Sequence, residues 1–451
     1  MHSIFRVLGT AFALALLGAC SASSPAAAAK LQTVSKTLTS TQAVPGGASI
    51  RVENMLGDVR FSQGGTQLQV TATVVAGAAD RAAAQALADS IHLTMQNEAN
   101  QISLHVDYPV DAHDTYRYQS ARPGASGTNG INVLGLHISG NFSGNSAFTY
   151  QGKAVRVTQG ESAQGTPLQV NLAIQLPKGI RASVDNHVGT IDAADLANTL
   201  ELHNDWGDMS TRHTAGNLSV ETGSGDASIV DHTGNAAAHT GSGDLTLRQV
   251  TGDVDLHTGS GDIDVTELNA RTITMKTGSG DLHLRQTTGD MDLHTGSGDI
   301  TGNTVRASRI ATRAGSGDIK LDDIKLDGTR SGTASGSLDV HTGSGNITLD
   351  RAVGLTTADV DSGSGDIHLS GDLSTLRTFD ISAASGDITL ASSKPPAVHL
   401  EIESPEIHAN WAGISNTKTS ERRFSGDLGA ATATGSVRSA SGSVTLTSPA
   451  D

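Results

Sequence analysis

The four-residue motif Gly-Ser-Gly-Asp repeats through the middle of the chain at a nearly constant spacing. Its first glycine stands at Gly223, Gly241, Gly259, Gly278, Gly296, Gly315 and Gly363, and Gly343 begins a variant that ends in Asn346. The steps from Gly223 to Gly315 are 18, 18, 19, 18 and 19 residues. A shorter Gly-Asp turn midway in several repeats divides each into halves of about five strand residues and four turn residues. Such a period is typical of stacked repeat units.

Between the motifs, apolar and polar residues alternate, as they do in half-buried strands. Stacking of successive repeats would pair each strand with its copy one repeat later, about 4.8 Å away, and would join thin units into one core. We therefore predict an all-β fold, a parallel β-solenoid (β-helix) of about 18–20-residue rungs with two short strands each, where a rung is one turn of the solenoid. The predicted inward residues are Leu247, Val254, Leu256 and the ladder Leu245, Ile263, Leu282, Ile300, Ile319, Ile347, Ile367 and Ile388.

The residues before the repeats predict a β-rich segment with one short helix. Alternating apolar residues indicate the strands, and an aspartate before an Ala-rich run can cap a helix. The predicted elements are strands at 49–52 and 68–74 with a turn at 57–58, a helix at 81–89 capped by Asp80, and a hairpin of 91–95 with 102–106.

Residues 108–165 are rich in Gly, Ser and Asn, yet they hold six of the chain's 13 aromatic residues. These rings can pack a long loop onto the core or cap the open end of a solenoid. Alternatively, tyrosines can form a stacking surface for sugar rings or peptide side chains, because each offers an apolar face and a polar tip. The six residues are Tyr108, Tyr116, Tyr118, Phe142, Phe148 and Tyr150, and the four tyrosines are candidate binding residues.

The N-terminus resembles a bacterial lipoprotein signal. An apolar run from Val7 to Ala19 is too short to span a bilayer, and it ends in Leu17-Gly18-Ala19-Cys20. By this resemblance Cys20, the only cysteine, would be lipidated, and Ser21 would favour outer-membrane sorting. The alternative is cleavage after Ala29, which would give a secreted protein. The predicted organisation is 1–19 signal peptide, 20–44 lipidated tether, 45–107 N-terminal strands plus helix cap, 108–168 Gly/Ser/aromatic insertion, 169–390 β-solenoid, and 391–451 C-terminal rungs with a cap that includes Trp411.

Negative charge is concentrated in the repeats. Residues 181–390 hold 31 acidic and 14 basic side chains, a balance of −17, whereas the whole chain carries −16. This charge excludes a nucleic-acid partner, because phosphate binding needs clustered Lys and Arg. It favours cationic peptides or a basic partner surface. The candidate acidic binding residues are Asp244, Asp262, Asp281 and Asp299.

Several of these features together resemble a known family. Ile50-Arg51-Val52-Glu53-Asn54, Gly57-Asp58-Val59, the Ala-rich helix and the repeated Thr-Gly-Ser-Gly-Asp are similar to the bacterial DUF4097 family of adhesin-like β-strand repeat proteins. The resemblance covers most of 45–450 but not 108–165, which is longer and more aromatic. It implies an extracytoplasmic, non-catalytic surface or adhesion role.

The motif aspartates form a ladder that has two interpretations. Stacked carboxylates could bind Ca²⁺ between rungs, or they could accept backbone amides at the corners. The nonapeptide calcium repeat separates its aspartate from the preceding glycine by one residue, whereas here Asp follows Gly directly, so turn capping is favoured and no cofactor is predicted. The ladder comprises Asp226, Asp244, Asp262, Asp281, Asp299, Asp318, Asp366 and Asp387.

Two further residue series run parallel to the aspartates. Inward threonines before each corner are expected to bond one another or the turn backbone, because no base is placed beside them. Outward residues one position earlier are interpreted as solvated surface, since cationic side chains interrupt the histidines that a metal would need. The series are Thr222, Thr240, Thr258, Thr277, Thr295 and Thr342, and His239, His257, Lys276, His294, Arg313 and His341.

The predicted function is a non-catalytic, lipid-anchored binding scaffold or adhesin of the cell envelope, facing the periplasm or the outside. Its ligand could be a protein, a cationic peptide or a glycan. One alternative is a polysaccharide-active β-helix using acids at the break in the repeat near 320–330, where Asp322, Asp323 and Asp327 stand among Lys320, Lys325 and Arg330. The others are an envelope-stress accessory protein that binds cationic peptides and a structural spacer.

Overall fold

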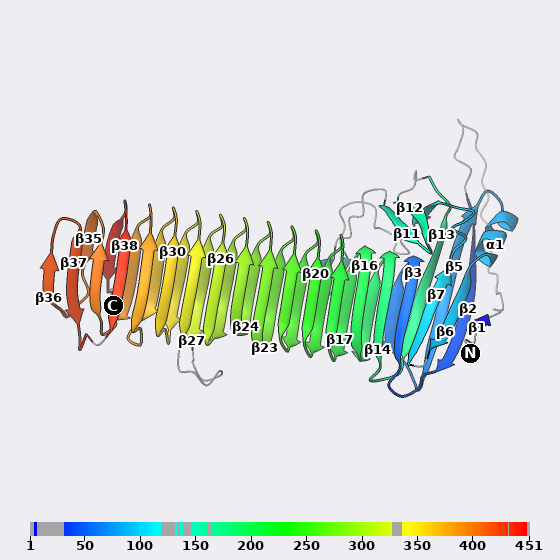
Figure 1. Cartoon of the computed structure of the whole chain (residues 1–451), viewed down its shortest axis with the longest axis horizontal. Helices are drawn as coiled ribbons and strands as arrows, with labels where there is room; N and C mark the ends of the chain where they lie inside the picture. Colours follow the sequence, from blue (N-terminus) through cyan, green and yellow to red (C-terminus); the bar gives the residue numbers. More distant parts are fainter. Residues whose placement is uncertain are drawn as a thin grey trace. The chain divides into compact units, whose positions relative to one another are not determined.

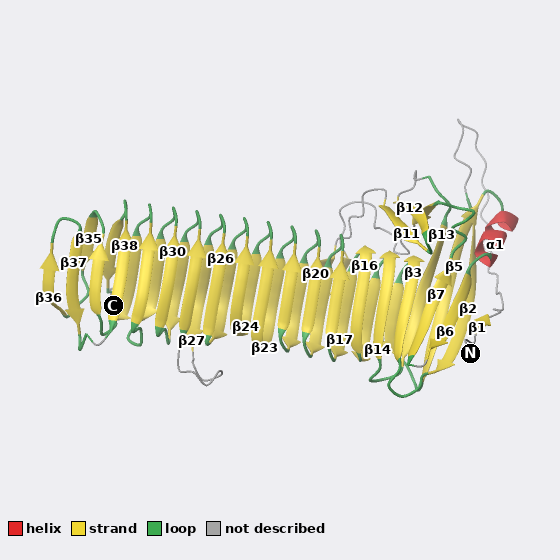
Figure 2. Ribbon diagram, in the orientation of Figure 1, coloured by secondary structure: helices red, strands yellow, loops and turns green. Residues whose placement is uncertain are grey.

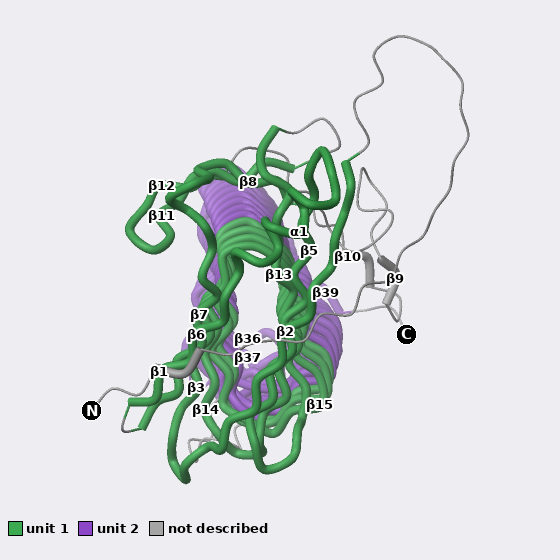
Figure 3. Tube along the Cα trace, turned by 90° about the vertical axis from the view of Figure 1, so that its right-hand side faces the viewer, with its two compact units in different colours: residues 1–233 green, residues 234–451 purple. Residues whose placement is uncertain are grey.

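The computed structural model describes residues 4–6, 31–98, 100–118, 131–133, 136–138, 146–159, 164–326, 336–431 and 433–448. These residues form almost only β-strands, with one short helix, so the predicted all-β solenoid is confirmed (Figure 2). The chain divides into two compact units, residues 1–233 and 234–451, which Figure 3 colours separately. Most of the predicted signal peptide, Cys20 and the alternative cleavage site lie outside the described residues.

Unit 1 contains the helix and nineteen labelled strands in its described part. They are β1 (Ile4–Arg6), β2 (Gln32–Ala43), β3 (Ser49–Leu56), β4 (Val59–Gln63), β5 (Gln67–Ala78), α1 (Arg81–Asp89), β6 (His92–Glu98), β7 (Gln101–Asp107), β8 (Thr115–Tyr118), β9 (Ile131–Val133), β10 (Leu136–Ile138), β11 (Ser146–Tyr150), β12 (Lys153–Gln159), β13 (Leu168–Leu176), β14 (Arg181–Val188), β15 (Ile191–Ala197), β16 (Thr199–Trp206), β17 (Met209–Ala215), β18 (Leu218–Thr222) and β19 (Ala227–Thr233).

Two stacks of parallel strands form the centre of unit 1 (Figure 1). One stack pairs β7, β3, β14, β16 and β18 in that order, and the other pairs β13, β4, β15, β17 and β19. The first rung, β3 with β4, therefore lies directly against β14 with β15, although more than a hundred residues separate them in sequence. The intervening chain leaves the solenoid and returns to it.

The edge of unit 1 is built from antiparallel strands. β6 pairs antiparallel with β7 and places Leu93 opposite Val106 and Met95 opposite Leu104, which confirms the predicted hairpin. The predicted helix is also confirmed, because Asp80 accepts the amide of Ala83. β2 pairs antiparallel with β5 along its whole length, so residues 32–43 of the expected tether form a strand of the sheet.

Unit 2 consists of the remaining strands. They are β20 (Ala236–Thr240), β21 (Leu245–Thr251), β22 (Val254–Thr258), β23 (Ile263–Thr277), β24 (Leu282–Thr295), β25 (Ile300–Ala307), β26 (Arg309–Ala314), β27 (Ile319–Leu326), β28 (Ser337–Thr342), β29 (Ile347–Val353), β30 (Thr357–Ser362), β31 (Ile367–Asp372), β32 (Thr378–Ala383), β33 (Ile388–Lys394), β34 (His399–Glu403), β35 (Glu406–Ala409), β36 (Ile414–Thr419), β37 (Arg423–Leu428), β38 (Thr434–Ser439) and β39 (Ser443–Thr447).

The predicted core ladder of unit 2 is confirmed residue by residue. Leu245 pairs with Ile263, and each later member pairs with the next through Ile388. All eight side chains are at most 1 % exposed. This continuous column of branched aliphatic side chains explains how a core forms with few aromatic residues.

In the described part of unit 2, six rungs also have a bend that the alternation of apolar and polar residues does not predict. Gln249 has φ of 56° and lies between the buried residues Leu247 and Val250, so the alternation shifts by one residue. Non-glycine residues adopt this left-handed conformation at some cost, because Cβ crowds the backbone. Equivalent residues in later rungs of unit 2 are Glu267, Gln286, Thr304, Asp323 and Arg351.

The C-terminal end of unit 2 is covered by antiparallel strands. β34 continues the parallel stack against β38, and β37 and β36 then add to it in antiparallel orientation. Trp411 is 3 % exposed and its indole N–H donates to the carbonyl oxygen of Thr447. This arrangement limits the exposed edge of the solenoid, which would otherwise pair with other chains.

Candidate functional site

The threonine series holds the corners together. The Thr258 hydroxyl donates to the carbonyl oxygen of Gly243 in the preceding rung (2.9 Å) and accepts the amide of Gly261 in its own corner (3.0 Å). The same pair of bonds recurs at Thr277, Thr295 and Thr342. The prediction that these hydroxyls bond the turn backbone is therefore confirmed.

The aspartate ladder caps amides of the next rung. Asp244 Oδ1 accepts the amide of Asp262, whose own Oδ1 accepts the amide of Asp281, and the series continues through Asp299 to Asp318. Asn346 takes the same place and accepts the amide of Asp366. This is the turn-capping role that was weighed against calcium binding. Ligand binding by Asp244, Asp262, Asp281 and Asp299 stays a prediction.

The paired glycines of the motif are required by close backbone approach. A Cβ on Gly261 would lie 1.9 Å from the carbonyl oxygen of Gly243, and one on Gly259 would lie 2.3 Å from that of Gly241. Neither glycine has φ in the left-handed range. In unit 2 a positive φ occurs at glycines of the opposite corner, such as Gly252 with φ of 140°. Rung-to-rung contact therefore explains the motif.

The four candidate tyrosines are buried in unit 1. Tyr108 and Tyr150 donate their hydroxyls to the carbonyl oxygens of Leu56 and Val106, both at 2.6 Å, and the two rings meet edge to face. Tyr116 is fully buried against Tyr108. Burial raises the pKa of all three phenols well above the usual value. These rings pack the insertion onto the solenoid and present no open face.

Tyr118 is 6 % exposed and donates its hydroxyl to Asp58, whereas Phe142 lies outside the described residues. The partly exposed aromatic surface is made by other residues. Phe148 stacks on His187 with ring centroids 4.5 Å apart and lies 5.7 Å from the Trp206 ring. Trp206 and Phe148 are 58 residues apart in the chain, so no local sequence pattern groups them.

Next to this aromatic surface, histidines alternate with carboxylates. His187 and His203 both contact Asp205, at 2.5 and 3.0 Å, and these contacts hold the pKa of Asp205 far below its usual value despite partial burial. The hydrogen bond between His105 and Glu53 raises the pKa of the imidazole and lowers that of the carboxyl. The network makes unit 1 locally polar beside the rings.

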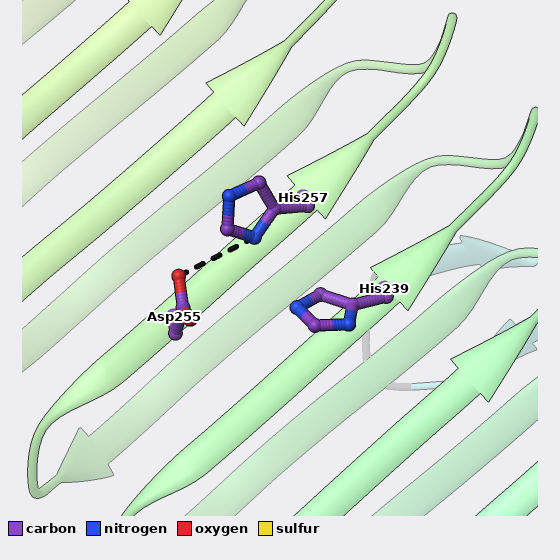
Figure 4. A group of neighbouring side chains, drawn as sticks. All are labelled: His239, Asp255 and His257. Atoms are coloured by element: carbon purple, nitrogen blue, oxygen red, sulfur yellow. Dashed lines mark ion pairs between the residues drawn. The ribbon is translucent and has the colours of Figure 1, made fainter.

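The outward series in unit 2 lies in register, from His239 through His257, Lys276, His294 and Arg313 to His341. The structure also places Asp255 beside the first two histidines, on the same face (Figure 4). Burial lowers the pKa of His257. Asp255 raises this pKa, whereas His239 and Lys276 lower it further. The sequence predicts solvated surface for this series, and Asp255 belongs to none of the predicted series of residues.

A groove of about 700 Å³ lies on the same outward face of unit 2, across β26, β28, β30, β32, β34 and β38. The carboxylates Asp339, Asp359 and Asp380 stand in register on three adjacent strands, with Glu401 nearby. Arg309 is the one Lys or Arg among the lining residues. No motif marks this groove in the sequence, because its acids occupy ordinary outward strand positions.

The break in the repeat near 320–330 is only partly described. Asp322 forms an ion pair with Arg351 at 2.6 Å, and Asp323 has φ of 52° at the bend of its rung. Asp327 and Arg330 lie outside the described residues. Asp322 thus has a structural partner in Arg351.

These features define a β-solenoid built from corner-capped rungs. The model of the Toastrack DUF4097 family matches residues 139–325 and 330–451, more than half of the chain. The chain therefore belongs to the DUF4097 family, and the predicted resemblance is confirmed. No curated protein matches it.

Among solved structures, the chain is similar to three bacterial proteins at low identity. Their names propose a role in cell adhesion (Clostridium sporogenes), an adhesin (Bacteroides fragilis) and lipid binding (Parabacteroides distasonis). The identities are 8, 12 and 9 %, and the TM-scores are 0.16, 0.17 and 0.20. The alignments cover 93, 92 and 92 % of this chain and 100, 97 and 97 % of the others. Within the described residues, no helix has the length and apolar character needed to cross a bilayer.

Proposed function

We propose that the protein is a non-catalytic, extracytoplasmic scaffold that binds a cationic peptide or a basic protein surface in the acidic groove of unit 2. The observation that carries this proposal is the register of Asp339, Asp359 and Asp380 on adjacent strands. Parallel strands about 4.8 Å apart concentrate like charges, and an incoming cation relieves their repulsion.

The groove is a better candidate than the corner aspartates. Each corner carboxylate accepts an amide of the neighbouring rung, whereas Asp359 is exposed and belongs to the open groove. Asp339 and Asp380 are held in place by Arg313 and Arg438 at 3.2 and 3.4 Å. These guanidinium groups offset part of the charge of Asp339 and Asp380, so the exposed Asp359 and Glu401 would supply most of the attraction for an extended cationic segment.

The test is binding of oligolysine to the full chain across a salt series. The groove variant combines Asp359→Asn with Glu401→Gln, and the matched control combines Asp262→Asn with Asp281→Asn. Asn346 already replaces a corner aspartate, so the control keeps the corner bonds while removing the same number of charges. We expect the groove variant to bind about tenfold more weakly and the control to bind almost normally. Affinity that ignores salt, or that survives the groove variant, would contradict the proposal.

A second candidate is glycan binding at Phe148 and Trp206 in unit 1, because their partly exposed rings suit stacking on sugars. Binding of an uncharged glycan should not depend on salt. Trp206→Ala should abolish it, whereas the groove variant should leave it intact.

The proposal includes a lipid anchor on Cys20 and an outer-membrane location facing the periplasm or the outside. Cys20→Ser should move the protein from the membrane fraction to the soluble fraction, since acyl chains supply most of such membrane affinity. Unchanged fractionation with a mature N-terminus at Lys30 would support the secreted alternative. Release of reducing ends from an envelope polysaccharide by pure protein would instead support an enzyme.

A further inference from the structure

His239, Asp255 and His257 form a compact group of metal-ligating side chains on the outward face of unit 2. His239 on β20 and His257 on β22 are direct partners in adjacent parallel strands. Asp255 stands two residues before His257, so the two side chains share one face. Figure 4 shows both imidazoles and the carboxylate on this face.

The distances suit a small metal ion. One potential ligand atom from each of the three residues lies within 4.8 Å of the others, and Asp255 Oδ1 is 3.3 Å from His257 Nδ1. The imidazole centroids are 4.9 Å apart at 73°, so the rings are not stacked against each other. Tetrahedral Zn²⁺ with bonds of about 2.0–2.2 Å separates its ligand atoms by roughly 3.3–3.6 Å. Small side-chain rotations would therefore complete the geometry.

One ligand atom has an ion-pair contact but no hydrogen bond. Nδ1 of His257 is buried from solvent, and within the described residues it makes no hydrogen bond, although it lies near the Asp255 carboxylate. Buried polar atoms in proteins normally have a hydrogen-bond partner or a ligand. A bound ion would satisfy this nitrogen and the carboxylate together.

The other group of similar composition in the described residues, Asp339, His341 and Asp359, is less suitable. It offers one imidazole, and its Asp339 carboxylate is engaged by Arg313 at 3.2 Å and by His341 at 2.5 Å. A guanidinium on a ligand carboxylate opposes a cation. Of these two groups, the His239 group is the one that combines two imidazoles with a carboxylate.

We propose that His239, Asp255 and His257 form a surface site for a divalent first-row transition ion, for which Zn²⁺ is the reference. Two imidazole nitrogens and one carboxylate oxygen would bind it and leave a fourth position open to water or to a donor atom from another molecule. Lys276, which follows His257 in the outward series, opposes binding by charge repulsion. This inference does not depend on the acidic groove.

The experiment is equilibrium dialysis of the full chain, made without a histidine tag, against Zn²⁺, with Co²⁺ spectroscopy as a second readout. We expect one equivalent of Zn²⁺, weakened about tenfold or more by His239→Asn or by Asp255→Asn. Co²⁺ should show d–d bands whose intensity indicates low coordination number, and these bands should vanish in the same variants. Lys276→Gln should bind Zn²⁺ severalfold more tightly.

The matched control is His294→Asn, a histidine of the same outward series on β24, which should leave stoichiometry and affinity unchanged. His341→Asn tests the competing group. The proposal is overturned if the His239 and Asp255 variants bind Zn²⁺ normally, or if His341→Asn removes the bound ion. Circular dichroism of each variant should match the wild type, because His239 and Asp255 are exposed.

Discussion

The corners of the rungs are built from different residues in the two units. In unit 1 three corners begin with a buried asparagine and continue through two full-sized residues to a glycine, as in Asn204-Asp205-Trp206-Gly207, and its last corner is Thr222-Gly223-Ser224-Gly225. In unit 2 most corners begin with a buried threonine and continue through Gly-Ser-Gly, and Ala314 and Ser362 take the place of the threonine in two of them. Asn54 donates to Asn186 and Asn186 to Asn204, side chain to side chain, at 2.9 and 3.1 Å. The hydroxyls of Thr258, Thr277, Thr295 and Thr342 instead bond backbone groups of their own corner and of the preceding corner.

This difference determines where each unit can carry chemistry. The corners of unit 1 hold His187, Asp205 and Trp206, which form the polar network and part of the aromatic surface. The corners of unit 2 contain glycines because the neighbouring rung lies too close for a Cβ. The acidic groove and the His239 group of unit 2 lie on outward strand faces instead.

A charge placed in the core should have the largest effect on the free energy of unfolding. It tests whether the cores of the two units are equally destabilised by a buried carboxylate. Ile263→Asp in unit 2 and Ile191→Asp in unit 1 each place an unpaired carboxylate at a site at most 1 % exposed. We expect each to lower the free energy of unfolding by about 3–5 kcal/mol. Thr246→Asp on the outward face should be nearly neutral. Denaturant titration measures all three, and equal damage at Thr246 would contradict the assigned register.

The last glycine of the corner should have the next largest effect. A Cβ on Gly261 would meet the Gly243 carbonyl oxygen at 1.9 Å, and that oxygen belongs to backbone that cannot rotate away. We expect Gly261→Ala to destabilise unit 2 by about 2–3 kcal/mol. Gly46→Ala, with nothing near its Cβ, is the control in unit 1 and should be almost silent. If Gly261→Ala left the free energy of unfolding unchanged, the rungs would be able to separate locally.

The same comparison explains what the sequence could predict. The ladder through Ile263 and the helix after Asp80 follow from local periodicity and capping, which act over a few residues. The left-handed bend at Gln249 was missed because such a residue carries no side-chain requirement that marks it in sequence. A positive φ is a common reason for glycine in a tight corner, but at the Gly-Ser-Gly-Asp corner steric contact between rungs selects glycine instead.

The candidate surfaces were harder to predict than the fold. Tyr116 was a candidate binding residue because tyrosine suits binding surfaces, but its burial depends on how the insertion returns to the core. Phe148 meets Trp206, and Asp339 meets Asp359, only through the three-dimensional register of separate strands. No local pattern encodes these pairings.

Corner side chains should differ in how strongly neighbouring rungs are coupled. Asn186→Ala removes both the acceptor for Asn54 and the donor to Asn204, leaving two buried amides without their partner, and should cost about 2–3 kcal/mol. Thr277→Val removes one hydroxyl and should cost about 1–2 kcal/mol. Double-mutant cycles measure this difference in coupling between neighbouring rungs.

Asn186→Ala combined with Asn54→Ala should be less destabilising than the sum of the single changes, because they share one hydrogen bond. Thr277→Val combined with Thr342→Val should be additive, since each threonine bonds different backbone groups. Additivity in both pairs would mean that the two kinds of corner are energetically alike.

The smallest predicted effect is a pH response of opposite sign in the two units. In unit 1, Glu53 raises the pKa of His105 above 6.5, so this pair stabilises the fold fully below that value and the stabilisation is lost as the pH rises through the raised pKa. In unit 2, burial lowers the pKa of His257, so protonation opposes folding and stability is gained as the pH rises toward 6.5. Hydrogen exchange, corrected for its intrinsic pH dependence, should show protection of β3 and β7 falling between about pH 6 and 8 while that of β20 and β22 rises or stays level. Glu53→Gln should remove the slope at β3 and β7 and leave β20 and β22 unchanged, and a common slope in both units would refute the contrast.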